Sequence, residues 1–151
     1  MARRLVYKGS LNGTGPVFRN FPVNSNQTIY AGDVVILSSG KASILADDVN
    51  ETPGSILGVS NTDIATTTAG ADDIIAVDIN PASIYEAPYN GDLANVAVGD
   101  TLDMHTAGYI VDTTDETTGC FQVLPQPDGT NANTVKGTMD VLLTGRVYGM
   151  A

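Results

Sequence analysis

A Gly-Asp turn that leads directly into a strand-like run occurs twice in this chain, and this feature limits the fold more than any other. Gly32-Asp33 precedes an apolar run over residues 34–37, and Gly99-Asp100 precedes a shorter run over 101–102. Glycine adopts backbone angles that other residues resist, and aspartate hydrogen-bonds nearby backbone groups, so the pair marks entry into a strand. A second glycine and a second apolar run follow each turn, without a helical pattern between them. Two such units predict a barrel or sandwich built from hairpins.

The rest of the chain has the same character. Short apolar or alternating runs, such as 17–23, 74–79 and 139–148, are separated by clusters of Gly, Asn, Asp and Pro. We therefore expect an all-β fold, a small antiparallel β-barrel or sandwich with an extended N-terminal arm. No linker divides the chain, so residues 1–27 are predicted as a basic arm and residues 28–151 as a single acidic β-rich body.

Charge is distributed unevenly along the sequence. Residues 1–32 carry four basic side chains and no acid, a charge of +4, whereas the remainder carries 3 − 17 = −14, which gives the net charge of −10. The acidic body repels phosphate, so we expect no nucleic-acid partner. No apolar run approaches the length of a membrane span, and we expect no membrane partner. The basic segment is either a solvated terminus or an arm that lies on an acidic surface of another subunit.

Catalytic and metal-binding patterns are missing from the sequence. His105 is the single histidine, and Cys120 is the single cysteine, so neither a His cluster nor a Cys-based metal site can form. The glycine-rich turn at Gly13-Thr14-Gly15-Pro16 is not followed by a helix or a phosphate-binding lysine. We expect no enzymatic activity, no cofactor and no metal. A homo-oligomeric β enzyme with a site between subunits stays open, and it would need a cluster around His105 from another chain.

Four motifs in sequence order carry a family resemblance. They are Tyr30-Ala31-Gly32-Asp33-Val34-Val35, Gly40-Lys41-Ala42, Gly54-Ser55-Ile56-Leu57-Gly58-Val59 and Val98-Gly99-Asp100. Over roughly residues 28–112 the chain resembles the small β-rich capsid cement, or head decoration, proteins of tailed bacteriophages. The resemblance implies a virion protein, made in the host cytoplasm. It would bind the outer surface of the mature capsid, often as a homotrimer, and reinforce contacts between subunits of the major capsid protein without catalysis.

Two sets of residues are predicted to matter for this role. The structural turns are assigned to Gly32, Asp33, Gly58, Gly99 and Asp100. Contacts with the capsid or with a neighbouring decoration subunit are assigned to the arm residues Arg3, Arg4, Tyr7, Lys8, Phe18, Arg19 and Phe21. Deleting residues 1–23 is expected to leave a folded body that binds shells weakly. The alternative function is a carbohydrate- or receptor-binding domain of a virion fibre, for which Tyr85 and Tyr89 offer aromatic faces.

Overall fold

The computed structural model describes residues 4–45, 55–68, 70, 72–104, 110–114 and 119–149. These residues form strands and turns and contain no helix, which confirms the all-β prediction. The strands are β1 (Val6–Ser10), β2 (Phe18–Pro22), β3 (Thr28–Ile29), β4 (Val34–Ser38), β5 (Lys41–Ile44), β6 (Ile56–Ser60), β7 (Ile64–Ala65), β8 (Ile74–Asp78), β9 (Ser83–Asn90), β10 (Thr101–Met104), β11 (Val111–Asp112), β12 (Phe121–Val123) and β13 (Thr138–Leu143).

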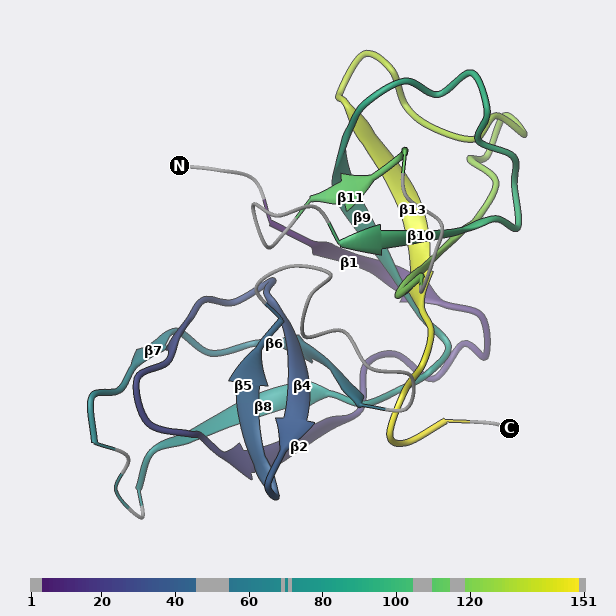
Figure 1. Cartoon of the computed structure of the whole chain (residues 1–151). Helices are drawn as coiled ribbons and strands as arrows, with labels where there is room; N and C mark the ends of the chain where they lie inside the picture. Colours follow the sequence, from purple (N-terminus) through teal and green to yellow (C-terminus); the bar gives the residue numbers. More distant parts are fainter. Residues whose placement is uncertain are drawn as a thin grey trace.

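The strands gather in two lobes, placed at the bottom and the top of Figure 1. The lower lobe contains a sheet in the order β2-β8-β6-β4-β5, together with the short pair β3 and β7. The upper lobe contains β1 and β9 to β13, in the order β1-β9-β11-β10-β12-β13, and β13 also pairs with β9. The pairings in the upper lobe therefore run from β9 through β11, β10, β12 and β13 back to β9, and β1 lies outside this ring.

The two lobes repeat one arrangement of five strands. In the lower lobe the antiparallel pairs run β2-β8-β6-β4-β5, and in the upper lobe they run β9-β13-β12-β10-β11. In both lobes the end of the first strand also meets the fifth strand in parallel. This pairing joins Val23 to Ala42 in the lower lobe and Tyr89 to Val111 in the upper lobe. Each sheet thus curls until its first and fifth strands meet.

The register of the pairs agrees with this repeat residue by residue. Pro22 pairs with Ile74 in the lower lobe, and Pro88 pairs with Thr138 in the upper lobe. Each proline is followed by the residue that makes the parallel contact and then by an asparagine, Asn24 or Asn90. The described residues therefore contain two copies of one five-stranded unit in topology and register, and β1, β3 and β7 lie outside the repeat.

Each lobe has an apolar interior built from equivalent positions. In the lower lobe Val35, Ile75 and Val77 are fully buried, and their equivalents Leu102, Met139 and Val141 are fully buried in the upper lobe. Alternate residues of a strand face the same side of a sheet, so these side chains fill the space enclosed by each curled sheet.

The two Gly-Asp turns have the same hydrogen bonds. The N–H of Asp33 donates to the carbonyl oxygen of Tyr30 (3.0 Å), and the N–H of Tyr30 donates to Oδ2 of Asp33 (2.8 Å). The corresponding bonds between Asp100 and Ala97 measure 3.1 and 2.8 Å. The intervening glycines have φ values of +96° and +94°, a region that favours glycine. The side chain binds the backbone three residues earlier, which closes the turn before β4 and before β10.

Gly58, predicted as a turn residue, lies instead within β6, and the reason for the glycine is steric. A Cβ at this position would lie 1.9 Å from the carbonyl oxygen of Asp78 on the neighbouring strand and 3.1 Å from Nη2 of Arg146. The strand is also irregular here, because Val35 pairs with Gly58 whereas Ile36 pairs with Ile56. Gly58 therefore permits a close approach of backbones rather than a change of chain direction.

The segment predicted as an extended arm differs from that expectation, since its described part belongs to both lobes. Val6 in β1 pairs with Glu86 in the upper lobe, and Phe18 in β2 pairs with Asp78 in the lower lobe. At the other end of the chain, the N–H of Val147 donates to the carbonyl oxygen of Ile56 (2.8 Å), so the residues after β13 return to the lower lobe. Deleting residues 1–23 would remove one strand from each lobe, and we now expect it to unfold the protein.

The duplicated turns provide a matched test of packing. We expect Gly99→Ala to cost about 1–2 kcal/mol, from the left-handed backbone alone, because no atom lies within 4 Å of the added Cβ. Gly32→Ala has the same backbone cost, but its Cβ would lie 2.7 Å from Cβ of Arg4 and 2.8 Å from the carbonyl oxygen of Leu5. Overpacking adds about 1–3 kcal/mol. Denaturant unfolding should show the larger loss for Gly32→Ala, and equal losses would contradict this packing of residues 4–5 against the turn.

Candidate interaction surface

No group of three or more His, Cys, Asp or Glu side chains in the described part of the chain is arranged to hold a metal ion. The described residues also contain no helix that is long and apolar enough to cross a membrane. Arg3 and His105 lie outside the described residues.

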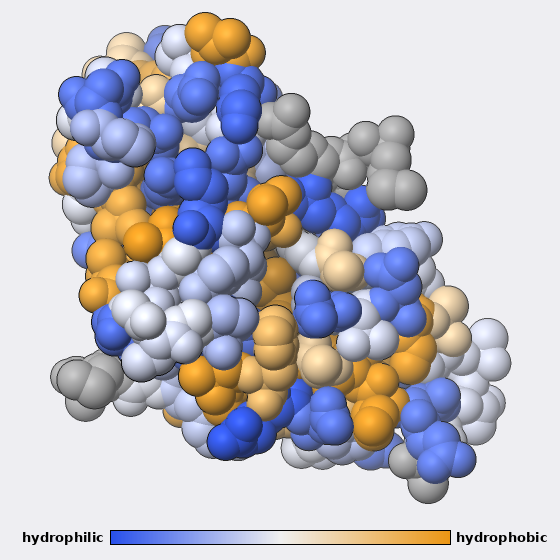
Figure 2. All heavy atoms as spheres, turned by 180° about the vertical axis from the view of Figure 1, so that it is seen from behind, coloured by the Kyte–Doolittle hydropathy of each residue, from blue (hydrophilic) through white to orange (hydrophobic). Residues whose placement is uncertain are grey.

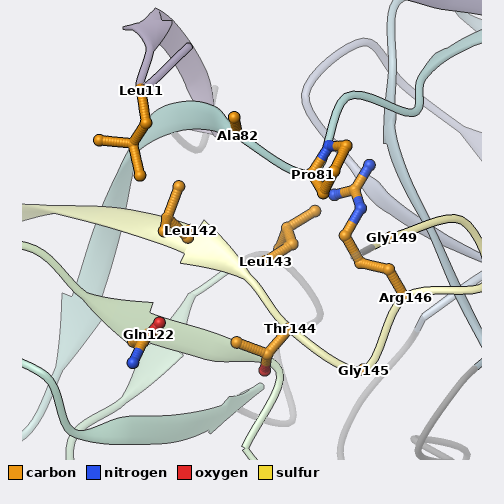
Figure 3. A pocket seen from close by; sticks show the side chains of 10 residues that line it. All are labelled: Leu11, Pro81, Ala82, Gln122, Leu142, Leu143, Thr144, Gly145, Arg146 and Gly149. Atoms are coloured by element: carbon orange, nitrogen blue, oxygen red, sulfur yellow. The ribbon is translucent and has the colours of Figure 1, made fainter. Parts of the chain in front are cut away.

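One pocket of about 550 Å³ lies beside β13 in the upper lobe (Figure 3). Leu11, Leu142 and Leu143 supply its apolar wall, and Gln122 and Thr144 supply uncharged polar groups. Arg146 also lines the pocket, but its guanidinium group extends toward Pro81 and away from Gln122 and Thr144. The lining has neither a carboxylate nor a nucleophile beside a base, so this pocket has no groups for acid-base or covalent catalysis.

A buried polar cluster joins the two lobes, and no motif in the sequence indicates it. The Oδ1 atom of Asp78, at the end of β8, accepts hydrogen bonds from the N–H groups of Val17 and Asn80, each at 3.0 Å. Its Oδ2 atom accepts the hydroxyl of Tyr85 in the upper lobe at 2.5 Å. The Nη2 atom of Arg146 donates to the carbonyl oxygens of Asp78 and Leu57, each at 3.1 Å. Four segments of chain therefore meet at one aspartate.

Burial shifts the pKa values of Tyr85 and Arg146 in this cluster. Burial raises the pKa of the Tyr85 phenol well above its ordinary value of 10.0, and the hydrogen bond to Asp78 raises it further. Burial also lowers the pKa of the Arg146 guanidinium, against the attraction of Asp78. Tyr85 is only 5% exposed, so it cannot present an aromatic face to a sugar, and Tyr89 is partly buried against the same core. The two aromatic faces considered for carbohydrate binding are thus used in packing.

Arg4, a predicted contact residue, is bound inside the molecule. Its Nε atom lies 2.7 Å from Oδ1 of Asp33, and its guanidinium lies 4.5 Å from the centre of the Tyr30 ring. Burial raises the pKa of the Asp33 carboxyl, while the backbone hydrogen bond from Tyr30 and the charge of Arg4 act in the opposite direction. Arg4 therefore compensates the buried carboxylate of the first Gly-Asp turn.

Lys8 is also engaged within the protein. Glu86 and Asp140 lie directly opposite each other on β9 and β13, a repulsive arrangement of like charges. The Nζ atom of Lys8 lies 3.4 Å from Glu86 and 3.6 Å from Asp140, and Lys136 lies 3.7 Å from Glu86. The two lysines thus offset the repulsion between the two carboxylates.

The remaining predicted contact residues fall into two places. Tyr7 and Phe18, together with Val6 and Pro16, line a hollow of about 310 Å³ at the junction of the lobes, which we call the junction groove. Tyr7 also packs edge-on against Tyr85, with ring centres 5.8 Å apart. Figure 2 shows that hydrophobic groups reach the surface near the lobe junction on the face it displays.

Phe21 and Arg19 do not belong to the junction groove. Phe21 packs against Tyr148, with ring centres 6.2 Å apart. Arg19 donates from Nη1 to the carbonyl oxygen of Phe18, its neighbour in β2, at 2.9 Å. Arg19 thus differs from Arg4 and Lys8, for each of which an intramolecular ion pair with a carboxylate is observed.

Comparison with known proteins adds no family assignment. No protein-family model matches the chain, and no curated protein matches it significantly.

The buried contact between Tyr85 and Asp78 gives a test by pH. Because the folded state holds the Tyr85 proton more tightly than the unfolded state, its stabilising contribution is full below pH 10 and is lost as pH rises further. The loss should approach about 1.4 kcal/mol for each pH unit. We expect Tyr85→Phe to lower the unfolding free energy at neutral pH by about 1.5–3 kcal/mol.

Denaturant unfolding of both proteins at about pH 9 and about pH 11 measures this difference. The gap between wild type and Tyr85→Phe should narrow at the higher pH. A gap that stays constant would contradict the burial of a protonated phenol at the lobe junction.

Proposed function

We propose that this protein is a structural virion component that binds the outer surface of a mature phage capsid and reinforces contacts between major capsid protein subunits. In this proposal it assembles as a homotrimer and performs no chemistry, as the sequence resemblance implies. The observation that carries the proposal is the junction groove, where Tyr7 and Phe18 leave aromatic surface exposed although the lobes beneath them are well packed.

The energetics of the groove suit binding to a protein surface. Phe18 is 41% exposed, and Tyr7 and Val6 are also exposed. Covering such side chains stabilises a complex by about 25 cal/mol for each Å² of apolar surface removed from water. Exposed ion pairs contribute only about 0–1 kcal/mol each. Because Arg4 and Lys8 already have carboxylate partners, apolar burial is the main source of affinity in this proposal, and Arg19 supplies the charge.

The lobe junction gives the groove a rigid base. Tyr7 packs on Tyr85, whose hydroxyl donates a hydrogen bond to Asp78, so the Tyr7 ring is held in place before a partner binds. A surface that is already ordered loses little conformational entropy on binding. This property fits a protein that reinforces a shell, since a rigid body resists the relative movement of the subunits it touches.

Sedimentation with shells tests this function. We expect the purified protein to co-sediment with mature phage shells and less with immature shells. Phe18→Ser should weaken this binding at least about tenfold, because about 1.4 kcal/mol of apolar contact is lost. Val135→Ser is the matched control, since Val135 is 96% exposed on the loop before β13 and does not line the groove. Circular dichroism should confirm that both variants remain folded.

Two results would contradict the proposal. One is wild-type protein that sediments with neither kind of shell. The other is equal binding by wild type and Phe18→Ser, which would show that the groove is not the contact surface.

A further inference from the structure

The internal repeat exposes a difference between the two lobes at one sheet edge. In the upper lobe the outer edge of β9 is covered by β1, which pairs with residues 83–86. In the lower lobe the equivalent strand is β2, and β2 stands at the end of its sheet with β8 on one side. Among the described residues no strand covers the outer edge of β2 over Phe18 to Asn20.

The backbone of β2 is oriented for strand addition. Within antiparallel pairs, alternate residues direct their N–H and C=O groups to opposite edges. The N–H of Ile79 donates to the carbonyl oxygen of Val17, and the N–H of Val23 donates to the carbonyl oxygen of Asp73. The odd-numbered residues of this segment therefore direct their backbone N–H and C=O groups toward β8. Phe18 and Asn20 therefore direct their backbone groups outward. Their equivalents, Ile84 and Glu86, are the β9 residues that β1 covers.

The proline in β2 agrees with this reading of the edge. Proline lacks an N–H, and Pro22 ends the run of outward donors. Its equivalent Pro88 lies just beyond the β9 residues that pair with β1. In each lobe, two residues with outward backbone groups thus precede a proline at equivalent positions. A described strand covers this edge in the upper lobe only.

The side chains beside this edge define the occupant. Arg19 binds the outward carbonyl oxygen of Phe18 with its own guanidinium, and β2 contains no acidic residue. A carboxylate on an added strand would attract the guanidinium of Arg19 away from the carbonyl oxygen of Phe18. That carbonyl oxygen could then accept an N–H from the added strand. Phe18, exposed at the same edge, would then pack against apolar side chains of the addition.

We propose that the outer edge of β2 binds an extended, acidic segment of another protein as an additional antiparallel or parallel strand, in the place that β1 takes on β9. This inference rests on the proposed function, in which the segment belongs to a capsid subunit. A second copy of this chain fits poorly, because its own sheet-edge strand β1 carries Lys8 and no acid, which would place like charges together. Main-chain hydrogen bonds supply the affinity and Arg19 selects the charge.

Amide hydrogen exchange tests the edge in the free protein. The outward amides of Phe18 and Asn20 should exchange faster than those of Ile84 and Glu86, which lie under β1. The probe is a synthetic five-residue peptide that alternates glutamate with valine, and the control is its lysine counterpart. The glutamate peptide should slow exchange at Phe18 and Asn20 at least about threefold, and the lysine peptide should not.

A matched pair of variants tests the backbone contact. Asn20→Pro removes an outward N–H that β8 does not use, so it should leave the fold intact, whereas Asn20→Ser keeps the N–H. We expect Asn20→Pro to weaken binding of the glutamate peptide and of mature shells about tenfold, and Asn20→Ser to bind as wild type does. Melting temperatures measured alongside should show that both variants are folded.

The outcomes separate the edge from the function. Equal peptide binding by Asn20→Pro and wild type, or the absence of protection at Phe18 and Asn20, would overturn strand addition even if shells are bound. Peptide binding that follows this pattern while wild type ignores shells would support the edge and contradict the capsid as its partner. Slow exchange at these two amides in the free protein would also overturn the proposal, since the edge would already be covered.

Discussion

The carboxylate of Asp78 is the buried polar interaction that links the two lobes. A buried carboxylate is costly unless each oxygen is hydrogen-bonded, and here two backbone N–H groups and a phenol meet that need. The donors come from the connection before β2, the connection after β8 and from β9 itself. Loss of the carboxylate would leave donors unpaired in three segments at once. One side chain therefore couples the entry to the lower lobe, the passage between the lobes and the first strand of the upper unit.

The lobe junction is built at positions where the two units differ. Gly58 and Asp78 of the lower unit correspond in register to Phe121 and Leu142 of the upper unit. A large apolar residue fills the interior at Phe121, whereas glycine at the equivalent position leaves room for Asp78 and Arg146. The shared positions build the curled sheet, and the positions that differ make the junction. This division explains why the five pairings agree in register although few side chains are the same.

The sequence predicts those parts of the fold that depend on neighbouring residues. Gly32-Asp33 and Gly99-Asp100 lie in turns before strands because both the glycine angle and the aspartate bond are formed within four residues. The positions of β1 and β2 could not be derived in this way, since Val6 pairs with Glu86, far along the chain. Charge composition suggested a separate arm, but pairing to distant strands determines where these residues lie. The position of Gly58 within β6 is a further example, because the carbonyl oxygen that leaves no room for a Cβ there belongs to Asp78, which is not a neighbour in sequence.

The contact residues illustrate the same limit for function. A basic segment ahead of an acidic body suggests an arm that binds acidic groups of another protein. Arg4 and Lys8 instead form ion pairs with carboxylates of their own chain. Lys8 in particular offsets the electrostatic repulsion between Glu86 and Asp140, so its charge stabilises the upper sheet and is already used within the protein. Strand pairing, not charge composition, determines which side chains remain available to a partner after folding. The exposed aromatic surface at Phe18 and the neighbouring charge of Arg19 lie on β2, whose counterpart in the upper lobe, β9, is covered by β1. A strand added to the outer edge of β2 would cover that edge in the lower lobe, as β1 covers the edge of β9 in the upper lobe.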